Sequence, residues 1–136
     1  MVTNAFDIKF ESKPENITLV EQFIENVCKE HNITDEAFGN IFIGLTEAAN
    51  NAIYHGNDED PTKSVVMRLE EKNDTSITFF VSDEGPGFDP DELPDPTAPE
   101  NIENPTGRGV FLMQQLSEDL SYNEKGNEAT IKFSIQ

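Results

Sequence analysis

The feature that most restricts the fold of this chain is a proline-rich segment in its second half. Six of the eight prolines lie between Asp83 and Thr106. Proline lacks a backbone N–H and restricts the residue before it, so this segment forms neither a long helix nor a central strand. A loop of this length is typically a lid, a binding loop or a disordered segment. The regular structure must therefore come from the sequence on either side.

Hydrophobic periodicity before this loop predicts a strand followed by two helices. Residues 6–10 alternate between apolar and polar side chains, which indicates a strand. Residues 12–15 resemble a capping box that opens the first helix. Thr34 is expected to cap the second helix, and Gly56 is expected to end it. The apolar residues at helical spacing are Ile17, Val20, Ile24 and Val27 in the first helix and Phe38, Ile41, Phe42, Leu45, Ala48, Ala49, Ala52 and Ile53 in the second.

The remaining regular segments predict strands in neighbouring pairs and one more helix. Residues 65–69 and 77–81 have the composition of strands, and the polar residues 72–74 between them suit a turn. A third, apolar helix is expected to start near Gly109. The segments of a final hairpin follow: residues 120–122, residues 125–127 for the turn, and residues 130–135. The chain is therefore predicted to be an α+β two-layer sandwich, with a mostly antiparallel sheet and the helices on one face.

Charge and cysteine content narrow the functional classes. The 136 residues include 27 acidic and 9 basic side chains, a net charge of −18, so the phosphates of a nucleic acid would be repelled. The single cysteine, Cys28, excludes an internal disulfide framework and a cysteine-rich zinc site. No apolar run is long enough for a membrane span, and residues 1–10 lack the pattern of a signal peptide. We therefore expect one cytoplasmic domain over residues 1–136 that binds neither nucleic acid nor membrane.

A polar row on the second helix is the first candidate site. Glu47, Asn51 and His55 recur every four residues, and on an α-helix this spacing places them in one row. The amide oxygen of Asn51 suits a hard cation such as Mg²⁺, and the carboxylate of Glu47 can act as a general base. The same spacing is also typical of a solvated helix edge, and the spacing alone leaves both interpretations open.

Two glycine-rich segments are further candidates. Residues 83–88 read Asp-Glu-Gly-Pro-Gly-Phe after a strand, where a carboxylate can accept a ligand's amino group and glycines let the ligand approach the backbone. Residues 107–109 read Gly-Arg-Gly before the predicted helix, where free amides and the helix dipole favour an anion. Taken singly, each segment is also typical of an ordinary turn or hinge. In this order around a long loop, they favour a nucleotide site.

These segments resemble the motifs of the GHKL superfamily of ATPases and kinases. Residues 47–56 are similar to its N-box, residues 83–87 to its G1 box and residues 107–109 to its G2 box. The short chain and the Asn-Ala-x-x-His-Gly pattern of residues 51–56 are most similar to the bacterial anti-sigma-factor serine/threonine-protein kinases. The resemblance implies the Bergerat fold, the α/β sandwich of histidine-kinase-like ATPases.

The resemblance also implies a role for each motif residue. Asn51 would bind the Mg²⁺ that bridges the phosphates of ATP, and Glu47 would be the catalytic base that acts on the attacking hydroxyl. Asp83 would accept the amino group of adenine. Residues 88–106 would form the ATP lid, and the amides of residues 107–109 would hold the terminal phosphates. The residues implied in ATP or ADP binding are Asn51, His55, Asp83, Gly85, Gly87, Gly107, Arg108, Gly109, Val110 and Thr130.

Some features of the sequence leave parts of this assignment open. Thr130 resembles the family threonine that fixes adenine through the aspartate, but the Gly-Thr pair common in the family's last glycine box is Gly126-Asn127 here. No lysine lies between the G1 and G2 boxes, so Mg²⁺, backbone amides and Arg108 would have to neutralise the phosphates. His55 would either close the phosphate end of the site or cap the helix.

The function implied by the resemblance is that of a Mg-ATP-dependent protein serine kinase that also acts as an anti-sigma factor. Its partners would be a sigma factor and a STAS-type anti-anti-sigma protein, which it would phosphorylate, and it would form a homodimer. The alternatives are a non-catalytic protein-binding module gated by ATP, a stand-alone histidine-kinase-like ATPase domain, and an acidic structural domain. Phosphorylation of a partner protein separates the kinase from the binding module.

Overall fold

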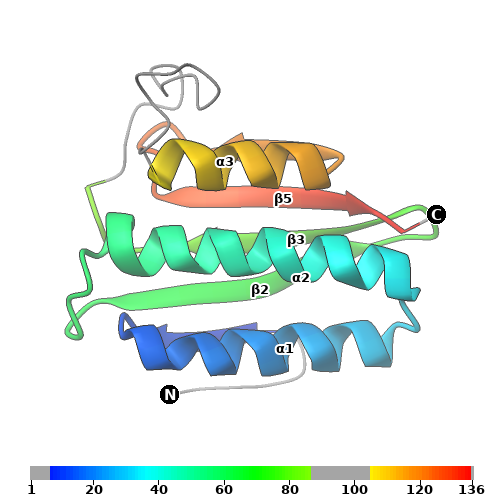
Figure 1. The fold of residues 1–136 in the computed structure, drawn as a ribbon, viewed down its shortest axis with the longest axis horizontal. Coiled ribbons are helices and arrows are strands. Elements are labelled where there is room, and N and C mark those ends of the chain that lie inside the picture. The colour runs from blue at the N-terminus through cyan, green and yellow to red at the C-terminus, as the bar shows by residue number, and fades with distance from the viewer. Residues whose placement is uncertain (1–6, 87–104, 136) are drawn as a thin grey trace.

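Three helices cover one face of a five-stranded antiparallel sheet in the part of the chain that the structure describes (Figure 1). The structure is a computed structural model, and it describes residues 7–86 and 105–135. The elements in chain order are β1 (Asp7–Glu11), a 3₁₀ turn η1 (Pro14–Asn16), α1 (Ile17–Glu30), α2 (Asp35–Asn50), a π-helical turn η2 (Asn51–Gly56), β2 (Ser64–Lys72), β3 (Ser76–Ser82), α3 (Pro105–Leu116), β4 (Asp119–Tyr122) and β5 (Glu128–Ser134). The predicted two-layer α+β architecture is confirmed. None of the helices in the described ranges is long and apolar enough to cross a membrane.

The strand order of the sheet is β1-β2-β3-β5-β4, and each neighbouring pair is antiparallel. The C-terminal hairpin therefore joins the sheet through β5, which lies beside β3, and β4 forms the edge. In the register between β3 and β5, Val81 pairs with Ala129 and Phe80 pairs with Thr130. This register decides which residues of β5 lie near the loop that follows β3.

The hydrophobic core lies between the helices and the sheet, and Phe79 of β3 connects both layers. Its side chain is 0 % exposed, and its ring packs edge-to-face on Phe23 of α1 and on Phe133 of β5, with centroids 6.2 Å apart in both pairs. Burial alternates along β3, so the next side chain, Phe80, faces away from the helices. On that face the guanidinium carbon of Arg68 lies 4.0 Å from the centroid of the Phe80 ring.

The predicted capping box before the first helix is wrong. The hydroxyl of Ser12 does not cap a helix; it donates to the carbonyl of Lys63 at 2.9 Å. The 3₁₀ turn η1 follows instead, with a proline in its first position, and α1 begins only at Ile17. The partner of Ser12 lies 51 positions along the chain, so no local pattern reveals it.

The second helix is capped as predicted, and its helical stretch ends at Gly56 as predicted, but residues 51–56 are π-helical. Thr34 Oγ1 accepts a hydrogen bond of 3.3 Å from an N–H in the first turn. The α-helical geometry stops before Asn51, and the π-helical turn η2 takes over, with the N–H of Asn57 donating to the carbonyl of Ala52 at 2.8 Å. Such π turns are rare and often occur at functional sites. The π turn here begins at Asn51, which the sequence predicts to bind Mg²⁺.

The third helix starts earlier than predicted. It begins at Pro105 and not near Gly109, so residues 107–109 lie inside the helix and not before it. Proline is tolerated in the first helical position, because the N–H that it lacks would have no partner there. The last two residues of the predicted lid, 105 and 106, are therefore helical, and the rest of the lid lies outside the described residues.

We expect Phe79→Ala to lower the unfolding free energy by about 3–5 kcal/mol, because it empties the space between α1, β3 and β5 that the ring fills. Phe80→Ala is the matched control on the opposite face, and it should cost about 1 kcal/mol, the order of its contact with Arg68. Urea unfolding measures both values. Equal losses would contradict the placement of the core on the helix-covered face alone.

Candidate functional site

The segments that the sequence singles out meet at one end of the molecule. The end of α2 with η2, the loop after β3, the turn between β4 and β5 and the start of α3 all lie at the left end in Figure 1. Contacts between α2 and α3 and between α3 and η2 agree with this view. The N-box-like, G1-like and G2-like segments are therefore neighbours in space, although 51 positions separate Gly56 from Gly107 along the chain.

The loop after β3 is held by hydrogen bonds from both sides. On one side, the N–H of Asp83 donates to the carbonyl of Asn127 at 3.0 Å, and Nδ2 of Asn127 donates to the carbonyl of Gly85 at 3.4 Å. On the other side, the N–H of Glu84 donates to Oδ1 of Asn57 at 2.7 Å. Within the loop, the N–H of Gly85 donates to Oδ1 of Asp83 at 2.8 Å. The loop itself therefore orients the Asp83 carboxylate.

The carboxyl group of Asp83 is shifted away from its ordinary acidity. Partial burial raises its pKa above the usual 3.8, because the charged form loses water. The hydrogen bond from Gly85 and the nearby cations Lys125 and Lys63 lower the pKa, but they do not cancel the effect of burial. A carboxyl group at the end of a strand whose pKa is raised by burial is a candidate functional group.

Two glycines allow η2 and this loop to touch. A Cβ on Gly85 would lie 1.8 Å from the carbonyl oxygen of Gly56, and a Cβ on Gly56 would lie 2.3 Å from the carboxylate of Asp83. The first collision is with backbone, which cannot turn aside as a flexible side chain can. The backbone contact therefore fixes how close Asp83 lies to the end of the second helix.

Glu47 and Asn51 lie one turn apart at the end of α2, and both are partly buried. Nδ2 of Asn51 is buried and has no hydrogen-bond partner among the described residues. Leaving a buried amide unpaired costs about 1–3 kcal/mol, so a folded protein rarely keeps one without a reason. The nitrogen can donate to a phosphate oxygen and, with the amide turned over, the oxygen suits Mg²⁺. Asn51 therefore fits the ligand role that the resemblance implies.

His55 does not share this environment. Its side chain is exposed, whereas that of Asn51 is partly buried. A spacing of four lies between the 3.6 residues of an α-helical turn and the larger number in a π turn, so it keeps side chains near one row in either geometry. The predicted row is therefore compatible with the π turn, but the exposed His55 lies outside the partly buried environment of Asn51.

A metal site built from side chains alone is not found in the parts of the chain that are described. These residues contain no group of three or more His, Cys, Asp or Glu side chains that could hold a metal ion. An Mg²⁺ ion at Asn51 would therefore take most of its ligands from phosphates and water, which is the usual manner of Mg²⁺ in phosphate sites.

The start of α3 contributes backbone groups to the same end of the fold. Gly107 lies in the first turn, where N–H groups lack partners within the helix and the dipole favours anions, whereas Gly109 lies one turn after Pro105. The predicted roles of the Arg108 and Val110 side chains lie outside the described residues. The prediction for Gly87 lies outside them as well.

Thr130 is placed away from Asp83. It lies on the open face of the sheet, where it lines a shallow concavity with Phe80, while the Asp83 carboxylate lies against Gly56 on the helix side. The residue of β5 that faces the helices at this level is Ala129, which is 8 % exposed. Side chains alternate between the faces of a strand, so a difference of one position decides the side. The expected pairing of Thr130 with Asp83 is therefore wrong.

Two asparagines that hold this site have no role predicted from the sequence. Asn57 is 0 % exposed and binds the loop after β3 from one side, and Asn127 binds it from the other. Nδ2 of Asn123 supports Asn127 by donating to its Oδ1 at 2.9 Å. The only sequence signals are an asparagine directly after Gly56 and an asparagine-rich hairpin turn. Neither signal identifies a partner 27 positions away, which is the separation of Asn57 and Glu84.

Comparison with known protein families identifies the fold. The family description "Histidine kinase-like ATPase domain" matches residues 10–133. The chain belongs to this family. The GHKL resemblance carried by the three motifs is thereby confirmed. This histidine kinase-like ATPase domain is also similar in structure to the histidine kinase domain from Erythrobacter litoralis EL346 blue-light activated histidine kinase, with a TM-score of 0.50 and 17 % identity over 99 % of this chain and 65 % of that one.

Relatives of this ATPase-family chain carry kinase and anti-sigma names. The serine-protein kinase RsbW of Oceanobacillus iheyensis is 22 % identical over 125 residues, covering 88 % of this chain and 78 % of the relative. The anti-sigma F factor of Clostridium acetobutylicum is 27 % identical over 135 residues, covering 96 % and 92 %. That of Heyndrickxia coagulans is 33 % identical over 101 residues, covering 71 % and 67 %. The resemblance to the anti-sigma-factor kinases is therefore confirmed.

We expect Gly85→Ala to lower the unfolding free energy by about 1–3 kcal/mol, because the added Cβ collides with the backbone of Gly56. Gly39→Ala is the matched control, since a Cβ there meets nothing within 4 Å. Gly39 lies within α2, so the same substitution there should stabilise the protein by about 0.5–1 kcal/mol. Urea unfolding of both variants checks the signs, and a neutral Gly85→Ala would contradict the close approach.

We expect Asp83→Asn to raise the melting temperature at pH 7. A carboxyl group whose pKa is raised by folding stabilises the fold below about pH 3.8 and loses this contribution as the pH rises through the folded pKa. The neutral amide avoids the loss and still accepts from Gly85. The difference between variant and wild type should therefore disappear as the pH falls toward about 4.

Asp60→Asn is the control with the opposite sign for the same measurement. Hydrogen bonds from the hydroxyl and N–H of Thr62 lower the pKa of Asp60, so its contribution is present above about pH 3.8 and lost as the pH falls. This variant should melt at a lower temperature than the wild type at pH 7. Calorimetric melting between pH 4 and 7 compares the three proteins, and a lower melting temperature for Asp83→Asn at pH 7 would refute the burial effect.

Proposed function

We propose that this protein is a Mg-ATP-dependent protein serine kinase that acts as an anti-sigma factor. The observation that carries the proposal is the contact between the loop after β3 and the end of the second helix, which places a partly buried Asp83 beside the segment that bears Glu47 and Asn51. Names of relatives at 22–33 % identity, serine-protein kinase and anti-sigma factor, support the same function. Residues 1–136 are proposed to act as one ATP-binding domain.

Asp83 is proposed to read the adenine base. An ionised carboxylate only accepts hydrogen bonds, and adenine presents an amino group where guanine presents a keto oxygen. The same carboxylate would therefore attract adenine and repel guanine. Its partial burial supports this role, because a hydrogen bond is stronger where less water competes for it. Gly85 beside it lets the base approach the backbone.

Asn51 and the start of α3 are proposed to hold the phosphates together with Mg²⁺. The unpaired amide of Asn51 and the first-turn amides around Gly107 both suit anionic oxygen or an ion bound to it. No lysine or arginine occurs in residues 83–106, so this part of the chain offers no cation to the phosphates. We therefore expect ATP affinity to depend strongly on Mg²⁺.

Glu47 is proposed to be the general base. It lies one turn before Asn51 and is partly buried, so a hydroxyl brought to the phosphate end of the site would be close to it. The carboxylate would orient the serine hydroxyl of a partner protein and take its proton. ATP supplies the phosphoryl group when it is bound.

The proposed partners are a STAS-type anti-anti-sigma protein, which would be the phosphorylated substrate, and a sigma factor. Phosphorylation adds about −1.5 to −2 charge to a serine. Next to a chain of net charge −18 this addition would weaken the contact, so the modified partner would dissociate. Homodimer formation is proposed from the family resemblance, and sedimentation equilibrium tests it.

We expect Glu47→Gln to retain ATP binding and to lose phosphoryl transfer by about 10²–10⁴-fold, because the amide cannot accept the proton. Asn51→Ala should instead lose the Mg²⁺-dependent part of ATP binding. Calorimetry with and without Mg²⁺ measures binding. Transfer from labelled ATP to a STAS-type protein of the same organism measures catalysis, with the phosphoserine located by mass spectrometry. Asn50→Ala, one position before Asn51, is the matched control and should leave both unchanged.

Each result has a definite meaning. Transfer retained by Glu47→Gln would remove Glu47 from the role of base. Nucleotide binding by the wild type without transfer to any STAS-type protein would favour a binding module gated by ATP. Absence of nucleotide binding in the wild type would refute the kinase and the binding module together.

A further inference from the structure

A buried asparagine that the proposed nucleotide site does not use connects three segments of the fold. We propose that Asn57 is a positioning residue: it holds the backbone of Glu84, and thereby sets the orientation of Asp83 and Gly85 toward an adenine nucleotide. This inference rests on the proposed function, because it concerns the same site. It adds a residue that touches no ligand and controls base selectivity through the loop.

The amide of Asn57 uses both its donors and its acceptor. Oδ1 accepts from the N–H of Glu84 at 2.7 Å, and Nδ2 donates to Oγ of Ser12 at 2.6 Å and to the carbonyl of Ser64 at 2.9 Å. The N–H of Glu84 can only donate and the carbonyl of Ser64 can only accept, so these partners determine which way the amide points. With 0 % exposure of Asn57, water does not compete for these bonds.

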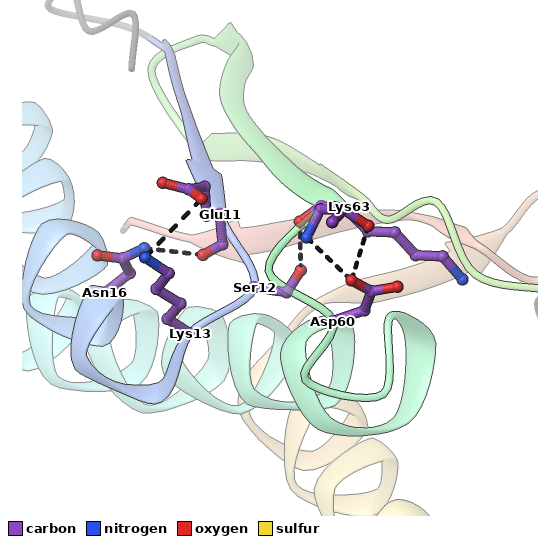
Figure 2. Close-up of polar contacts among 7 residues, drawn as sticks. Glu11, Ser12, Lys13, Asn16, Asp60 and Lys63 are labelled. Carbon is purple, nitrogen blue, oxygen red and sulfur yellow. Dashed lines mark hydrogen bonds and ion pairs between the residues drawn. The ribbon is translucent and has the colours of Figure 1, made fainter.

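Asn57 and its partner Ser12 are themselves held by further hydrogen bonds. Its own N–H donates to the carbonyl of Ala52 in η2, and the N–H of Asp60 donates to its carbonyl at 3.0 Å. Ser12, which is also 0 % exposed, links Asn57 to Lys63, because its hydroxyl donates to the carbonyl of Lys63 at 2.9 Å (Figure 2). In Figure 2 the side chain of Ser12 points toward Lys63, with Asp60 on the same side.

The backbone after Asn57 shows how strongly this region is constrained. Asp58 and Glu59 follow with φ of 53° and 56°, in the left-handed region that disfavours side chains. Two such residues in succession persist only where surrounding bonds determine the conformation. The N–H of Glu59 to the carbonyl of Ile53, at 2.7 Å, is one of these bonds. Asn57 is therefore a fixed point from which the loop after β3 is held.

Glu84 lies between Asp83 and Gly85 in that loop and is anchored twice from this side. Its N–H binds Asn57, and its carboxylate accepts from the N–H of Ser64. The residue before it carries the carboxylate that would read adenine, and the residue after it orients this carboxylate through its N–H. A shift of the Glu84 backbone therefore moves both Asp83 and Gly85. The anchor on the far side, from Asn127 to Gly85, is longer at 3.4 Å, so Asn57 makes the shorter of the two side-chain contacts to the loop backbone.

The experiment compares base selectivity with stability in Asn57→Ala. Calorimetry measures the Kd of ADP and of GDP, each with Mg²⁺, well below the melting temperature of each protein. We expect the wild type to prefer ADP. In Asn57→Ala we expect ADP to bind about tenfold more weakly or worse, and the ratio of the two Kd values to move toward one, because the aspartate is no longer held in place. Hydrogen exchange of the Glu84 amide should become faster in the variant, with or without nucleotide.

Asn73→Ala is the matched control. Oδ1 of Asn73 accepts from the N–H groups of Thr75 and Ser76, both at 2.9 Å, in the turn at the opposite end of β3. This variant should melt at a lower temperature but bind ADP and GDP as the wild type does. If both variants lose ADP affinity and selectivity equally, the effect is general softening of the fold and the positioning role is overturned.

Two further outcomes separate this inference from the proposed function. If the wild type binds ADP selectively and Asn57→Ala binds it equally well, the positioning role alone is overturned. If the wild type binds no ADP, the proposed function fails, and the inference fails with it. Should Asn57→Ala not fold, Asn57→Asp replaces it: its carboxylate still accepts from Glu84 but cannot donate to Ser64. Selectivity retained at reduced stability then supports the proposal, and lost selectivity overturns it.

Discussion

The contact between the backbones of Gly56 and Gly85 is the constraint on which the candidate site depends. It joins the end of the second helix to the loop after β3 with no side chain between them. The separation of the two halves of the site is therefore set by backbone geometry and not by flexible groups. The hydrogen bond from Glu84 to Asn57 needs the same closeness, because Asn57 follows Gly56 directly. A site built on such a contact is formed before a ligand arrives, which lowers the entropy cost of binding.

The same end of the molecule also holds features that oppose stability. Partial burial of Asp83 disfavours its charged form and raises its pKa, and Asn51 keeps a buried amide nitrogen without a partner among the described residues. Ser117 Oγ, just after α3, is also buried without a partner among the described residues, whereas the hydroxyl and N–H of the buried Ser76 both reach Asn73. Proteins tend to tolerate unpaired or desolvated polar groups where function requires them. The two costs at Asp83 and Asn51 lie in neighbouring segments, which agrees with a candidate site at this end of the molecule.

Local patterns predict the architecture well and the polar contacts poorly. The strands, the helices and the cap at Thr34 depend on residues that are close together in the sequence, so local patterns predict them. The capping box failed because Ser12 finds a partner 51 positions away. The expectation for Thr130 failed because one position decides the face of a strand. Asn57 could not be assigned for the same reason as Ser12: its partners come from other elements.

The distribution of cations in this acidic chain bears on how it could hold a nucleotide. Lys63 and Lys125 lie close enough to lower the pKa of Asp83, so they lie near the part of the site proposed to bind adenine. Residues 83–106 contain no lysine or arginine, although they lead into the helix assigned to the phosphates. Backbone amides contribute only partial charges, about half a unit at a helix start. If ATP binds here as proposed, the remaining negative charge of its triphosphate, in the field of a chain with net charge −18, would fall to Arg108 and a divalent ion. The proposed dependence on Mg²⁺ therefore rests on the charge pattern as well as on the chemistry of Asn51.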